Sequence, residues 1–117
     1  MAISIPIFTA QLNKSKYATD EANARAIYAE LQADYLANSE VQTATVDNKT
    51  VTEGTAITVT ITEQDGTENA YKFTGIVGVT ITTGNDAKAT TATTPSVSLA
   101  QCDKVKAEAV TFSNTTK

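Results

Sequence analysis

The 117-residue chain has no histidine and no tryptophan, and it has one cysteine, Cys102. Histidine is the commonest general base and metal ligand, so its absence removes most catalytic and metal-binding arrangements. A single cysteine cannot form an internal disulfide or a Cys-x-x-Cys site. The five glycines are scattered, and none belongs to a phosphate-binding loop. We therefore expect no enzymatic activity, no metal and no cofactor, and we assign Cys102 a structural role.

Basic charge and long apolar runs are also scarce. Nine basic residues stand against thirteen acidic ones, and a net charge of −4 has the wrong sign for binding nucleic acid. No run of about 18 apolar residues occurs, so the sequence as given predicts no membrane-spanning helix. Residues 1–12 carry no basic residue ahead of their apolar part, which is unlike a signal peptide.

Threonine and alanine divide the chain into two parts. Only two of the 22 threonines lie in residues 1–40, whereas nine of the eighteen alanines lie there. Alanine favours helix and threonine favours strand. Because the length suits one domain, we expect a single domain in which residues 1–38 form a helix and residues 39–117 form an antiparallel β-sheet with loops.

The helix is predicted to be long and to have two different faces. Residues 7–37 contain no Gly or Pro, and Pro6 precedes them where the first turn of a helix tolerates proline. About 30 residues would extend about 45 Å, beyond a domain of this size. Larger side chains recur at helical spacing, with Tyr17 at their start. The residues expected to pack on the sheet are Ala24, Ile27, Tyr28, Leu31 and Tyr35.

The opposite face of the predicted helix carries a stripe of small residues. Its members are Ala18, Ala22, Ala26, Ala29 and Ala33. The stripe is explained either by helix propensity alone or by a face that packs closely on another helix.

The start of the chain is unusually apolar for a soluble protein. Ser4 is the only polar residue between Ile3 and Phe8. Either this end folds back or frays, or it is the cut end of a longer apolar helix.

Four sequence elements follow one another in residues 2–37. They are Ile-Pro-Ile-Phe at residues 5–8, Lys-Ser at 14–15, Ala-Thr-Asp at 18–20, and Ala-Asn-x-Arg-Ala-x-Tyr-Ala-Glu at 22–30. In this order they resemble the type IV pilins, and more narrowly the pilin-like proteins of Gram-positive bacteria. The family's cleavage site and its Gly-Phe-Thr-Leu-x-Glu start do not occur, which suggests a chain cut within the family's membrane segment.

The resemblance implies an α+β fold in which a long spine helix packs on an antiparallel sheet. It implies a structural subunit that is anchored in the cytoplasmic membrane and then self-associates into a filament at the cell surface. The alternative is a minor pilin or secretion-system pseudopilin with an adhesive or ligand-binding role. For the chain without its anchor we expect a monomer. The residues assigned to the anchor and filament helix are Ile3, Ile5, Pro6, Ile7, Phe8 and Leu12.

Period-two alternation predicts the strands. Ile57, Val59 and Ile61 alternate with threonines, and a turn at residues 64–67 leads to a return strand containing Tyr71 and Phe73. We expect residues 70–83 to form one strand that is kinked or bulged at Gly75. Residues 43–52 are predicted to form a small hairpin, 84–95 a loop or edge strand, 97–99 a short strand or turn, and 104–113 a final strand.

Two further patterns leave alternatives open. Acidic residues at Glu63, Asp65 and Glu68, and Asp86 beside Asn85, resemble calcium-binding loops in some pseudopilins, but they lack EF-hand spacing and are typical of solvated turns. Tyr71, Phe73 and Phe112 are expected to face the core. Exposure of Tyr71 in a cleft would instead favour a binding module.

Overall fold

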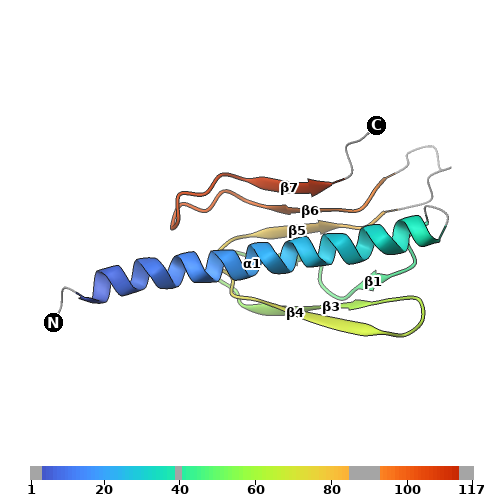
Figure 1. Cartoon of the computed structure of the whole chain (residues 1–117), viewed down its shortest axis with the longest axis horizontal. Coiled ribbons are helices and arrows are strands. Elements are labelled where there is room, and N and C mark those ends of the chain that lie inside the picture. The colour runs from blue at the N-terminus through green and yellow to red at the C-terminus, as the bar shows by residue number, and fades with distance from the viewer. Residues whose placement is uncertain (1–3, 39–40, 85–92, 114–117) are drawn as a thin grey trace.

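The fold is α+β, with one long N-terminal helix packed on antiparallel β-sheets (Figure 1). The computed structural model describes residues 4–38, 41–84 and 93–113, and it describes the side chains of the helix from Gln11 onward. The elements are α1 (Ser4–Ala37), β1 (Thr45–Val46), β2 (Thr50–Val51), β3 (Ile57–Thr62), β4 (Glu68–Phe73), β5 (Val79–Thr82), β6 (Ser96–Leu99) and β7 (Val110–Ser113). This confirms the predicted fold class.

Helix α1 has 34 residues and is the longest feature of a molecule that measures 60 × 30 × 18 Å. Alanine and unbranched side chains dominate it, which explains its length. Its N-terminal part extends beyond the ends of the strands, as predicted (Figure 1). No helix in the described part of the chain is both long and apolar enough to cross a membrane.

The strands form two antiparallel sheets side by side. Three strands pair in the order β1-β3-β4, and four pair in the order β2-β5-β6-β7. The chain passes between the sheets three times, from β1 to β2, from β2 to β3 and from β4 to β5. Helix α1 contacts β4 of the first sheet and β6 and β7 of the second, so it covers both.

The β3–β4 hairpin is the element that alternation predicts best. Its register runs from Ile57 opposite Phe73 to Thr62 opposite Glu68. At the turn, Gly66 takes a φ of 95°, and the Thr67 N–H donates to Asp65 Oδ1 at 2.9 Å. This carboxylate therefore stabilises a turn, as expected of an acidic residue beside a glycine.

The prediction of one strand over residues 70–83 is wrong. Strand β4 ends at Phe73 and β5 begins at Val79 in the other sheet. Between them Gly75 takes a φ of 83°, and its carbonyl oxygen accepts the Gly54 N–H at 2.7 Å. Alternation was misleading because Val77 continues the period-two pattern of β4 although it lies outside any strand. Its neighbour Ile76 is buried as well, so burial does not alternate here.

The hairpin predicted at residues 43–52 is also wrong. Strand β1 pairs with β3, and β2 pairs with β5. The segment therefore does not turn back on itself but joins the two sheets. The Asp47 N–H donates to the Thr60 carbonyl of the first sheet at 3.1 Å, and the Ile81 N–H of the second sheet donates to the Lys49 carbonyl at 2.8 Å. The residues between β1 and β2 are therefore also hydrogen-bonded to the two sheets.

Near the C-terminus, the strand predicted at residues 97–99 is confirmed as β6, but the final strand is shorter than predicted. It covers Val110–Ser113 rather than residues 104–113. Cys102 and Ala107 exchange two backbone hydrogen bonds of 2.9 Å, and Lys106 between them takes a φ of 57°. Residues 103–106 are thus a turn, so Val105 is not part of the strand that contains Val110. The loop predicted at 84–95 lies largely outside the described residues.

The core lies between α1 and the two sheets. Its largest fully buried side chains include Phe73 and Ile61 from one sheet, Leu99 and Val97 from the other, and Leu31 from the helix. Burial of these apolar surfaces is the main force that holds the helix on the sheets.

Candidate functional site

The face of α1 that was predicted to pack on the sheet lies against the core. Ala24, Ile27 and Leu31 have no exposed surface, and Tyr35 is 3% exposed. Tyr28 is half-buried and packs against the same cluster.

The residues assigned to the anchor segment lie at the protruding end of α1. Ile5, Pro6, Ile7 and Phe8 belong to the helix by their backbone, and Leu12 is 46% exposed. Ile3 lies outside the described residues. The helix continues through this segment and leads away from the strands, so the backbone does not fold back onto the core (Figure 1).

The alanine stripe lies on the exposed side of α1. Ala18, Ala22, Ala26, Ala29 and Ala33 are all exposed. Leu36, which lies in line with Ala18 at helical spacing, is 55% exposed. The alanines give this exposed face small side chains, which allow a second helix to approach closely.

One flank of α1 holds the sheets through polar contacts that the sequence analysis missed. The fully buried carboxylate of Asp20 accepts the Thr74 N–H at 2.8 Å and the Thr74 hydroxyl at 2.9 Å. Asn23 Nδ2 donates to the Lys72 carbonyl at 2.7 Å. Farther along, Asp34 Oδ2 accepts the Thr43 N–H at 2.5 Å and the Ala44 N–H at 2.8 Å. The spacing of Asp20, Asn23, Glu30 and Asp34 on one flank was the available signal.

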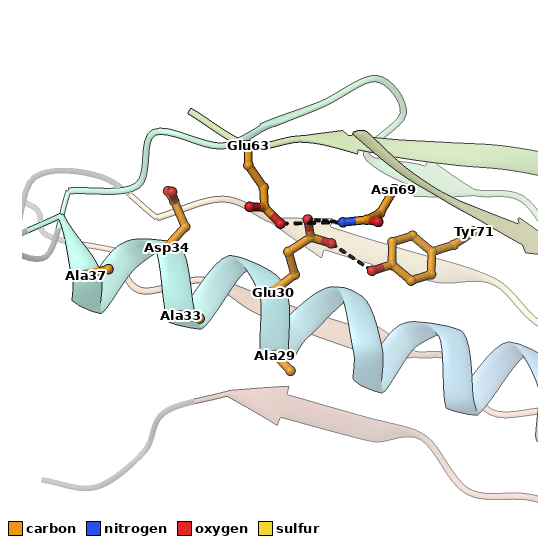
Figure 2. A pocket seen from close by; sticks show the side chains of 8 residues that line it. All are labelled: Ala29, Glu30, Ala33, Asp34, Ala37, Glu63, Asn69 and Tyr71. Atoms are coloured by element: carbon orange, nitrogen blue, oxygen red, sulfur yellow. Dashed lines mark hydrogen bonds between the residues drawn. The ribbon is translucent and has the colours of Figure 1, made fainter. Parts of the chain in front are cut away.

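Near the C-terminal end of α1, a cleft of about 590 Å³ separates the helix from the β3–β4 hairpin (Figure 2). Its helix wall consists of Ala29, Glu30, Ala33, Asp34 and Ala37, and its hairpin wall of Glu63, Asn69 and Tyr71. The cleft therefore combines carboxylates from both walls with small alanine side chains on the helix wall.

Hydrogen bonds join the two walls of this cleft (Figure 2). The Tyr71 hydroxyl donates to Glu30 Oε1 at 2.7 Å, and Asn69 Nδ2 donates to Glu30 Oε2 at 2.9 Å. The same nitrogen lies 3.4 Å from Glu63 Oε2. A hydrogen bond with Glu30, desolvation and the surrounding carboxylates raise the pKa of Glu63 to about 7. Burial and Glu30 also raise the pKa of Tyr71.

The three aromatic residues expected to face the core have different surroundings. Phe73 is buried, whereas Tyr71 and Phe112 are half-buried and pack against the rim of the core. The Arg25 guanidinium lies over the Phe112 ring, 5.3 Å from its centroid. Tyr71 lines the cleft, but it is half-buried there rather than fully exposed.

The acidic residues do not form a metal centre in the part of the chain that the structure describes. No three side chains of His, Cys, Asp or Glu there are grouped to hold a metal ion. Asn85 and Asp86 lie outside that part. The Cys102 thiol is buried and its Sγ lies 3.5 Å from the Ile76 carbonyl oxygen, a packing position beside the crossover between the sheets.

Comparison of the chain with protein-family models, with curated proteins and with solved structures found no match.

Proposed function

We propose that this chain is a pilin, the structural subunit of a type IV pilus or a related surface filament. The observation that carries the proposal is the form of α1. One helix protrudes beyond the strands, buries one face in the core, and exposes an alanine face on the other side. The ordered sequence resemblance in residues 2–37 supports the same function.

In the proposed function, an apolar helix that includes residues 4–12 anchors the subunit in the cytoplasmic membrane before assembly. The same helix then packs against its copies at the centre of the filament. Burial of apolar surface contributes about 25 cal/mol per Å² to this association. The sheets face outward, and exposed threonines such as Thr58 and Thr80 meet solvent at the cell surface.

The test is a pair of arginine substitutions in the chain as its source cell makes it. Ala22→Arg places a charge on the exposed helix face, and we expect filaments that label with antibody to this chain to disappear. Thr58→Arg, on an exposed position of β3, is the matched control and should leave them intact. Residues 1–117 on their own should sediment as a monomer. Absence of labelled filaments from the unaltered strain would contradict the proposal.

The second candidate is a minor pilin or pseudopilin with a ligand-binding role. The specific observation in its favour is that Tyr71 lines an open cleft with Glu30. A glycan array probed with the protein and with Tyr71→Ala tests it. Binding that the substitution abolishes would support this role, and an array without binding would argue against a carbohydrate-binding cleft.

A further inference from the structure

Two carboxyl groups from different elements converge on one donor in the cleft. Glu30 comes from α1, and Glu63 directly follows β3. The side-chain amide nitrogen of Asn69 lies within 3.4 Å of an oxygen of each. Figure 2 shows the two carboxyl groups side by side. Two carboxylates that share a site cannot both ionise without repulsion, so one of them retains a proton to higher pH.

We propose that Glu30 and Glu63 share one proton and so form a pH-dependent latch between α1 and the hairpin tip, residues 63–69. The latch is closed while the proton is bound between the two carboxyl groups. When solvent removes the proton, the two anions repel and the hairpin tip moves away from the helix. The proposal concerns this chain alone and does not depend on filament assembly.

The charges around the pair favour retention of the proton. Helix α1 adds Asp34 and the turn of the hairpin adds Asp65, both of which are negative. From β4, Tyr71 donates its hydroxyl to Glu30, and Glu68 is exposed. No lysine or arginine lines the cleft among the described residues. The pKa of about 7 for Glu63 agrees with this environment.

The packing confines the movement to the hairpin tip. Behind the tip, Ile61 and Phe73 are buried in the core, and Asp20 binds the backbone just after β4. At the tip itself the contacts are polar: Asn69 donates to Glu30, and the Thr43 hydroxyl donates weakly to Gln64 Oε1 at 3.4 Å. Loss of the shared proton therefore loosens the tip without unfolding the sheet.

The sign of the pH effect follows from proton linkage. The unfolded chain releases the Glu63 proton near its ordinary pKa of about 4.5, whereas the folded chain holds it to about 7. Across this window the folded state binds more protons, so the latch's stabilisation decreases as the pH rises from about 4.5 to 7 and is constant above it.

The test is NMR of the whole chain between pH 5 and pH 8.5. We expect the Glu63 carboxyl carbon to titrate with a midpoint near pH 7. Backbone order parameters of residues 63–69 should be about 0.85 at pH 5 and fall to about 0.6 at pH 8.5. A Glu63 midpoint below pH 5, or order parameters that do not change, would overturn the proposal.

Three variants separate the latch from a general effect of the hairpin. In Glu63→Gln the amide donates to Glu30 as the shared proton does, so the tip should stay rigid at both pH values. In Glu63→Ala, the hairpin tip should be mobile at both pH values. Glu68→Gln, which removes an exposed carboxylate from the same hairpin, should behave like the unaltered protein. A Glu63→Gln variant that retains the full pH dependence would show that another group titrates.

Discussion

Gly75→Ala should lower the free energy of unfolding by about 3 kcal/mol or more. The φ of 83° at Gly75 is left-handed, and a Cβ there costs about 1–2 kcal/mol. A Cβ would also lie 2.7 Å from both the carbonyl carbon and the carbonyl oxygen of Thr55. Backbone cannot move aside as a flexible side chain can, so overpacking adds about 1–3 kcal/mol. Chemical denaturation of the variant measures the sum.

Gly66→Ala is the matched control for this prediction. Gly66 has a similar φ of 95°, but nothing lies within 4 Å of the Cβ it would gain. We expect it to cost about 1–2 kcal/mol from backbone strain alone. Both substitutions reduce the entropy of the unfolded chain equally, so the difference between them isolates the contact with Thr55. Equal losses would show that the crossover shifts to accommodate a methyl group.

Local patterns were sufficient for the elements whose contacts are close in sequence. The composition of α1 and the alternation in β3 and β4 each describe one continuous piece of backbone, so periodicity predicted them. The division of the strands into two sheets has a different origin. It depends on Gly75, whose carbonyl accepts the Gly54 N–H from a distant segment, and on β1 and β2 pairing with different strands. Parity within a single strand contains no information on such pairings.

The same distinction applies to the candidate site. The exposed alanine stripe was visible in the sequence because a helix repeats every 3.6 residues. The cleft was not, because it brings Glu30 against Glu63 and Tyr71 through the register of a hairpin more than thirty residues away. Tyr71 was correctly assigned to the face of β4 that is turned toward the helix. Its side chain packs at the rim of the core and lines the cleft, rather than lying fully inside the core.

Asp20→Ala should lower the free energy of unfolding by about 3 kcal/mol, the other large effect we expect. The Asp20 carboxylate has no exposed surface, and it accepts two hydrogen bonds from Thr74 at the crossover between the sheets. Hydrogen bonds to charged groups contribute about 1.5–3 kcal/mol each, and alanine leaves the Thr74 N–H without this acceptor. Asp20→Asn keeps an oxygen for that N–H, so we expect it to cost about 1 kcal/mol.

A neighbouring carboxylate provides the control for Asp20. Glu21 lies next to it in α1, but its only ion pair among the described residues is with exposed Arg25, at 3.8 Å. Glu21→Ala should therefore change stability by less than about 0.5 kcal/mol.

A Thr74→Val substitution completes a double-mutant cycle, because it removes the hydroxyl but keeps the backbone N–H. The cost of Thr74→Val should shrink in the Asp20→Ala background. Strictly additive losses would mean that Asp20 stabilises the helix by some route other than Thr74, and that the crossover is held by Gly75 and the core alone.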